Sequence, residues 1–231
     1  SAWSTDGGQT YDHTTAAFTD PWPADEMRFV GGTSTEVVWR AGAAFYFSST
    51  LGASFQRTEV LDSLPTECAT ILGFDMPTDD HDVAAIWCDS GQAYVCNLVS
   101  DDCAAIPTAD PPTIINLIYA PSDPSTIYLF SGCSCGYSIF RSTDGGQSTT
   151  DVFNHRTYQA YVAPNDALRL CALDSLTSEL RCTADGGQSW SDLTIGDFPP
   201  YGSVWIESLA FDHLDGLWAA ASPGVFYHPP L

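Results

Sequence analysis

Apolar and polar residues alternate along most of this chain, and Pro, Asp and Gly interrupt the alternation at intervals. An alternating run, a turn and a second alternating run predict a β-hairpin, because successive side chains of a strand point to opposite faces. The pattern occurs five times, at residues 28–39, 72–87, 117–130, 160–173 and 208–221. The chain is therefore expected to be all-β.

A short turn motif also recurs between these hairpins. It reads STDGGQT at 4–10, STDGGQS at 142–148 and TADGGQS at 183–189. The last two copies are 185 − 144 = 41 residues apart, and the first two are 144 − 6 = 138 apart, or three intervals of 46. Two degenerate copies fall in the gap, SSTLGASF at 48–55 and NLVSDDCAAI at 97–106.

A repeat of this length is typical of one four-stranded propeller blade. Five hairpins and five turn motifs predict a single β-propeller domain of five four-stranded blades over residues 1–231. The chain begins with a turn motif and ends with a hairpin followed by GVFYH. Residues 1–15 are therefore expected to complete the blade of residues 205–231, which would close the ring and leave no open sheet edge.

The turn motif resembles the Asp-box, or BNR, repeat of sialidase-like and sortilin-like propellers. TADGGQSW at 183–190 fits the pattern S/T-x-D-x-G-x-S/T-W/F at every position. In a tight turn Gly permits the bend, Asp accepts backbone N–H groups, and an aromatic ring packs beneath. The resemblance implies structural roles for Asp6, Gly8, Asp144, Gly146, Asp185, Gly187 and Trp190.

Sialidase activity is disfavoured by departures from that family. Its F/Y-R-I-P motif has only MRFV at 27–30 as a counterpart, and its ring has six blades where five are expected here. DDHD at 79–82 is interpreted as a turn, and no HExxH, GxSxG or phosphate-binding loop occurs. We predict no catalytic residue, metal or cofactor. A glycoside hydrolase of sialidase-like ancestry stays the alternative, since any two of the 29 acidic residues could form its carboxylate pair.

Eight cysteines without a CxxC pair predict disulfides and an oxidising compartment. Cys88 with Cys96, and Cys171 with Cys182, occupy the two arms of a second hairpin in two different blades, so each pair is expected to form a cross-strand disulfide. The other four cysteines allow three connectivities, one of which joins Cys68 to Cys103 and Cys133 to Cys135.

The charge excludes some partners. There are 29 acidic and seven basic residues, for a net charge of −22, which disfavours nucleic acid and anionic membrane surfaces. No apolar run is long enough for membrane insertion. The start at Ser1 fits a processed chain, and no Asn-x-Ser/Thr acceptor occurs. We expect an extracellular, periplasmic or cell-surface protein of bacterial origin.

The expected function is non-catalytic. We interpret the chain as a recognition or scaffold module that binds a glycan or a protein partner, or else as one subunit of a larger extracellular assembly. Aromatic residues in the loops between blades are the candidate ligand contacts, because such rings suit sugars and protein surfaces. They are Trp22, Tyr158, Tyr201 and Trp205.

Overall fold

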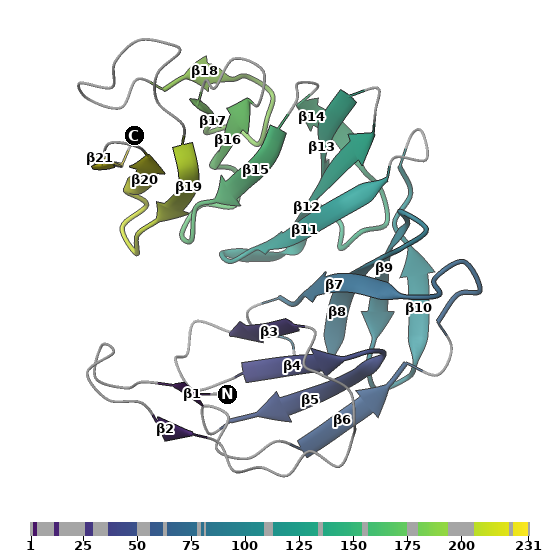
Figure 1. Ribbon diagram of the computed structural model, residues 1–231. Helices are drawn as coiled ribbons and strands as arrows, with labels where there is room; N and C mark the ends of the chain where they lie inside the picture. The colour runs from purple at the N-terminus through teal and green to yellow at the C-terminus, as the bar shows by residue number, and fades with distance from the viewer. Residues whose placement is uncertain are drawn as a thin grey trace. The chain divides into compact units, whose positions relative to one another are not determined.

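The computed structural model describes the chain in segments. These are residues 2–3, 12–13, 26–29, 37–49, 56–61, 64–77, 80, 82–108, 113–133, 136–153, 157–174, 180–193, 206–221 and 224–230. Every regular element in them is a β-strand, as predicted (Figure 1). None of these segments contains a helix long and apolar enough to cross a membrane. The chain divides into two compact units, residues 1–104 and 105–231, and each is described by itself.

The first unit contains a two-stranded hairpin and two four-stranded antiparallel sheets. The hairpin pairs β1 (Ala2–Trp3) with β2 (Asp12–His13). One sheet has the order β3 (Glu26–Phe29), β4 (Val37–Ala41), β5 (Ala44–Ser48) and β6 (Gln56–Val60). The other has the order β7 (Ile71–Asp75), β8 (Val83–Cys88), β9 (Ala93–Asn97) and β10 (Asp102–Ala105).

The second unit contains two four-stranded sheets and one three-stranded sheet. The first is β11 (Ile114–Ala120), β12 (Asp123–Cys133), β13 (Gly136–Ser142) and β14 (Thr150–Phe153). The second is β15 (Thr157–Val162), β16 (Leu170–Asp174), β17 (Leu180–Thr183) and β18 (Ser191–Asp192). The third is β19 (Ile206–Phe211), β20 (Leu217–Ala221) and β21 (Gly224–His228).

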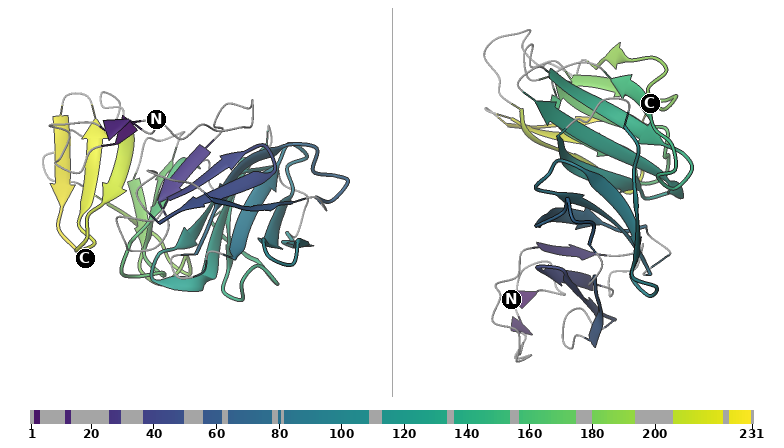
Figure 2. Two further views of the ribbon diagram at one scale, coloured as in Figure 1. Left: turned by 90° about the horizontal axis from the view of Figure 1, so that it is seen from below. Right: turned by 90° about the vertical axis from the view of Figure 1, so that its right-hand side faces the viewer.

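All these sheets are meanders in which each strand pairs with its neighbour in sequence (Figure 2). The five predicted hairpins are confirmed as the first two strands of the five larger sheets. The turn motifs are spaced as they are because they follow the third strand of a sheet. In every larger sheet the first residue of the motif, or of its counterpart, pairs with a residue of the second strand, in the pairs Val37–Ser48, Val83–Asn97, Ile127–Ser142, Leu170–Thr183 and Leu217–His228. The paired residue begins the second strand in each of these sheets except that of β12, which begins earlier, at Asp123.

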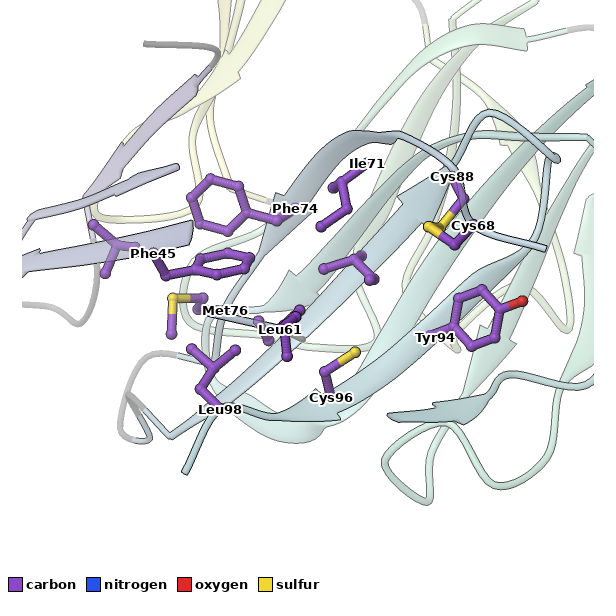
Figure 3. Close-up of a cluster of buried hydrophobic side chains, with 13 residues drawn as sticks. Phe45, Leu61, Cys68, Ile71, Phe74, Met76, Cys88, Tyr94, Cys96 and Leu98 are labelled. Atoms are coloured by element: carbon purple, nitrogen blue, oxygen red, sulfur yellow. A yellow bond between two sulfur atoms is a disulfide. The ribbon is translucent and has the colours of Figure 1, made fainter. Parts of the chain in front are cut away.

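The core of the first unit lies between its two four-stranded sheets (Figure 3). Phe45 of β5 and Phe74 of β7 are both fully buried, and their rings meet edge to face with centroids 5.3 Å apart. Ile86 of β8 belongs to the same cluster. Aromatic and branched side chains favour strands because they pack well on a pleated surface.

In the second unit, Tyr128 of β12 joins two sheets. Its ring is fully buried, and its hydroxyl donates a hydrogen bond of 2.7 Å to the carbonyl oxygen of Ala167, in the turn between β15 and β16. Burial raises the pKa of this phenol. A buried Tyr needs such a partner for its polar end, so the side chain fixes where the turn lies.

The predicted closure of the last blade stays a prediction. Among the described residues, β1 and β2 pair only with each other, and β21 has a strand on only one side. In the part of the second unit that the structure describes, the sheet of β19, β20 and β21 thus has three strands, whereas the other two sheets have four.

Three disulfides are present among the described residues. Cys171 and Cys182 face each other across β16 and β17 and form the predicted bond. The predicted Cys88–Cys96 bond is wrong. The turn begins directly after Cys88, whose backbone N–H bonds to Gln92, whereas Cys96 lies further along β9 opposite Ala84. The two sulfurs therefore cannot meet.

Each of those cysteines bonds to a residue outside the β8–β9 hairpin. Cys88 pairs with Cys68, in the segment that leads into β7, and Cys96 pairs with Cys103 on β10. The suggested Cys68–Cys103 bond is therefore also wrong. The side chains of Cys133 and Cys135 lie outside the described residues. Three disulfides fit a protein of an oxidising compartment.

Candidate functional site

Two DGG turns of the second unit, residues 142–148 and 183–189, have the same internal hydrogen bonds. In the first, Oδ1 of Asp144 accepts bonds from the Ser142 hydroxyl at 2.8 Å and the Ser148 backbone N–H at 2.9 Å. The Ser148 hydroxyl donates to Oδ2 at 2.5 Å. Both carboxylate oxygens are thus used within the turn.

The second DGG turn repeats this arrangement atom for atom. Oδ1 of Asp185 accepts from the Thr183 hydroxyl at 2.7 Å and the Ser189 N–H at 2.9 Å, and Oδ2 accepts from the Ser189 hydroxyl at 2.5 Å. The Thr183 hydroxyl in turn accepts the N–H of Gly187 at 2.9 Å. These bonds give a local reason for each polar position of the motif.

Hydrogen bonds hold both Asp side chains in the ionised form. The pKa of Asp144 is lowered from 3.8 to about 2, and among the hydrogen bonds that cause this the bond from the Ser148 hydroxyl is the largest. Bonds from Ser189, followed by Thr183, lower the pKa of Asp185 even further. A general acid needs a carboxyl group that is still protonated near neutral pH, so its pKa must be raised. Neither side chain suits that task.

The second DGG turn also contacts the preceding sheet. The Trp190 indole N–H donates to the Val152 carbonyl oxygen at 2.8 Å, and its ring lies 4.3 Å from the ring of Phe153. Arg141 of β13 donates a 2.7 Å bond to the Gly186 carbonyl oxygen. The motif therefore packs sheet against sheet as well as closing a hairpin.

The degenerate turn at 97–106 uses Asn in place of Asp. It connects β9 to β10, where a turn motif was expected, and Oδ1 of Asn97 accepts the N–H groups of Val99 and Ser100 at 3.0 and 2.9 Å. In the acidic segment 79–82, Oδ1 of Asp80 accepts the N–H of Asp82 at 2.9 Å, between β7 and β8. Among the described residues, no group of three or more His, Cys, Asp and Glu side chains could hold a metal ion.

An exposed apolar surface lies on the three-stranded sheet. Trp218 on β20 stands opposite Tyr227 on β21, with ring centroids 4.7 Å apart, and Val225 is further along β21. Their exposed fractions are 42%, 43% and 68%. We call these three residues the β20–β21 aromatic face.

The two faces of this sheet differ in burial. Leu217 and Ala219 of β20 point to the other side and are fully buried, where Phe226 packs with them. Alternation along the strands thus turns one row toward the preceding sheet and the other row outward. Single exposed apolar residues are ordinary, but a contiguous group indicates an interaction surface.

Asp212 fixes the position of Trp218. Its Oδ1 accepts the N–H groups of Gly216 and Leu214, and its Oδ2 accepts the indole N–H of Trp218 at 3.2 Å. The Gly216 bond is the largest cause of the lowered pKa of Asp212. This carboxylate is thus a fixed negative charge beside the aromatic face.

The ligand contacts proposed from the sequence are not visible in detail. Trp22, Tyr201 and Trp205 lie outside the described residues, and so do Asp6 and Gly8. Tyr158 is part of β15, but its side chain is not among those described. Sequence reasoning missed Trp218 and Tyr227. The available signal was the alternation in LWAAA and GVFYH, combined with the lack of a turn motif after GVFYH.

No protein-family model and no curated protein sequence matches the chain. Solved structures do match. A structure of YCF48 bound to D1 peptide aligns over 100% of this chain and 72% of its own, with a TM-score of 0.66 and 12% identity. YCF48 from Cyanidioschyzon merolae aligns over 99% and 76%, with a TM-score of 0.67 and 12% identity.

A GH74 enzyme from Niastella koreensis aligns over 88% of this chain, with a TM-score of 0.60 and 17% identity. This chain spans only 29% of that enzyme. All these neighbours are β-propellers, and at such identities the likeness shows the fold alone. The β-propeller prediction is supported, and the count of five blades stays a prediction.

Proposed function

We propose that this chain is a non-catalytic propeller module that recognises a polypeptide partner. The observation that carries the proposal is the β20–β21 aromatic face: two paired rings and a Val stand exposed on one side of a sheet, with a hydrogen-bonded carboxylate beside them. Exposed aromatic residues are enriched at protein interfaces because they bury much area at little entropic cost.

Two further observations support this proposal. The YCF48 neighbour binds a peptide, and it aligns over the whole of this chain. The net charge of −22 favours a cationic partner, because charge complementarity speeds association and rejects acidic competitors. The loop residues Trp22, Tyr158, Tyr201 and Trp205 are proposed as further contacts of the partner.

A glycoside hydrolase is the second candidate, because GH74 enzymes are among the structural neighbours. It would need two carboxyl groups at a suitable separation, one of them with a raised pKa. In the part of the chain that the structure describes, the four carboxyl groups with a clear pKa shift all have a lowered pKa: Asp123, Asp144, Asp185 and Asp212. The general acid of a catalytic pair would therefore have to be another residue.

One screen separates the two functions. The purified, oxidised protein is applied to an array of cationic, neutral and acidic peptides and to a glycan array, and eluted sugars are examined for cleavage. We expect binding to cationic peptides. Binding confined to glycans would contradict the proposed partner class, and cleavage of a glycan would establish the hydrolase. Alanine variants of Trp22, Tyr201 and Trp205 then test the loop contacts.

A further inference from the structure

Among the described residues, the three-stranded sheet of the second unit has no counterpart of the outer strand that the other two sheets of this unit have. In those sheets the third strand, β13 or β17, is followed by a DGG turn and a fourth strand. β21 occupies the same position, since His228 lies opposite Leu217, the first residue of β20, as Thr183 lies opposite Leu170, the first residue of β16. The corresponding pair in the β11–β14 sheet is Ser142 with Ile127. HPPL follows in place of a DGG turn.

No described strand pairs with the outer edge of β21. An edge strand presents backbone N–H and C=O groups that can pair with another extended segment. Natural sheets protect such edges with charge, Pro or bulges. Within β21 two side chains are exposed and apolar, Val225 and Tyr227, and Pro229 and Pro230 come only after the strand has ended. Its five residues pair with β20 without a register shift.

The N-terminal hairpin has the register of a third and a fourth strand of its own. Trp3 pairs with Asp12, and Cys182 pairs with Ser191 across the DGG turn at 183–189. The two pairs have the same sequence separation, and in each the first residue directly precedes a turn motif. By this register β1 is itself a third strand and β2 is its fourth strand. β1 therefore corresponds to β21 as a third strand, and β2 already pairs with β1 as its fourth strand.

We propose that the edge of β21 takes up an extended cationic segment of a partner protein as the fourth strand of this sheet. This inference rests on the proposed function and names the partner's chemistry. Residues of the added strand opposite Val225 and Tyr227 would stand on the outer side, beside the β20–β21 aromatic face. Residues opposite Phe226 would stand on the side that packs against the preceding sheet.

The chemistry of each side follows from its surroundings. On the outer side, a Lys or Arg can lie over the rings of Tyr227 and Trp218 and approach the carboxylate of Asp212, which bonds to Trp218. On the inner side, an apolar residue extends the cluster that includes Phe226. The partner segment therefore alternates cationic and apolar residues, with backbone pairing for affinity and side chains for specificity.

The test uses a labelled peptide of about seven alternating Lys and Val residues, enough to span β21. Amide methylation along one edge keeps it from pairing with itself. Fluorescence anisotropy measures its binding to the full, oxidised chain. We expect saturable binding, and we expect Val225→Lys or Tyr227→Lys to weaken it about tenfold or more, because each places a like charge beside the peptide lysines. Tyr227→Phe keeps the ring and should bind within about twofold of the unaltered protein.

The matched control is Val99→Lys, since Val99 is 64% exposed and Val225 is 68% exposed. It changes the net charge by the same amount far from β21 in sequence. Equal weakening by Val99→Lys and Val225→Lys would overturn the proposal, because the net charge alone would then explain the binding. Failure of the unaltered protein to bind the peptide would also overturn it.

A pair of introduced cysteines tests whether the chain's own N-terminal segment, in place of a partner protein, occupies the edge of β21. If β2 were the fourth strand, the observed offset would place Asp12 opposite Tyr227. An intramolecular disulfide in the variant Asp12→Cys with Tyr227→Cys would assign the edge to the chain's own N-terminal segment and overturn the proposal. Peptide binding that is lost in the loop variants and kept in Tyr227→Lys would overturn this inference while leaving the proposed function intact.

Discussion

At the residue scale, the acidic side chains with clear pKa shifts are structural. Asp144 and Asp185 each bind two hydroxyl groups and a backbone N–H, which leaves few lone pairs for a ligand. From the composition alone, any of the 29 acidic residues could belong to a catalytic acid–base pair. The hydrogen bonds show instead that turn geometry requires these two.

The stability of the protein should fall in acid because of these turns. The folded-state pKa of Asp144 is about 2, below its ordinary 3.8, so the unfolded chain binds a proton first as the pH falls. The contribution of Asp144 is complete above about pH 4 and is lost toward pH 2. We expect Asp144→Asn to lower stability at pH 7 and to flatten the loss between pH 4 and pH 2.

Urea unfolding at pH 7, 4 and 2.5 measures this. Ser148→Ala removes the bond that lowers the Asp144 pKa most, so it should shift the loss toward pH 4. If Asp144→Asn and the unaltered protein lose stability in parallel below pH 4, the assignment of this titration to the turn is wrong.

Gly187 is required by both conformation and space. Its φ is +93°, and a Cβ there would lie 2.5 Å from the Cβ of Val152. We expect Gly187→Ala to destabilise the protein by about 2–3 kcal/mol, since strain and overpacking add. Gly145 is the matched control: its φ is +68° and a Cβ would meet nothing within 4 Å, so Gly145→Ala should cost only about 1 kcal/mol. Equal losses in urea unfolding would contradict the role of Val152.

At the element scale, alternation and turn residues predicted the strands well. All five hairpins were visible because a strand with one exposed side repeats every second residue. The outward row of Trp218 and Tyr227 belonged to such a hairpin. It was not recognised, because nothing in a single strand says whether a neighbouring sheet covers it. That depends on packing between elements.

The disulfides also depend on contacts between elements, which the local sequence of one hairpin does not reveal. Cys171–Cys182 was predictable because both residues face each other in one hairpin. Cys68–Cys88 was not, because it joins a strand to the segment entering the sheet, and Cys88 stands at the end of its hairpin. Pairing of cysteines depends on register, which shifts with the length of a turn.

Peptide mapping of the oxidised protein should recover the Cys68–Cys88, Cys96–Cys103 and Cys171–Cys182 bonds. These close intervals of 20, 7 and 11 residues, so each should stabilise the fold by about 2–3 kcal/mol through loop entropy. We expect Cys171→Ala with Cys182→Ala to lower the free energy of unfolding by that amount. Recovery of a Cys88–Cys96 peptide would contradict the observed register.

At the scale of the whole molecule, the net charge of −22 opposes the compact state. Salt should relieve this repulsion, because the Debye length falls from about 30 Å at 0.01 M to about 10 Å at 0.1 M. We therefore expect the midpoint of thermal unfolding at pH 7 to rise with NaCl over this range. The binding of a cationic peptide should weaken over the same range, because salt also screens the attraction between opposite charges. Scanning calorimetry and anisotropy measure the two effects. At pH 4.1, the isoelectric point, the same salt should leave the midpoint nearly unchanged. An equal rise at both pH values would mean that salt acts on apolar burial rather than on charge.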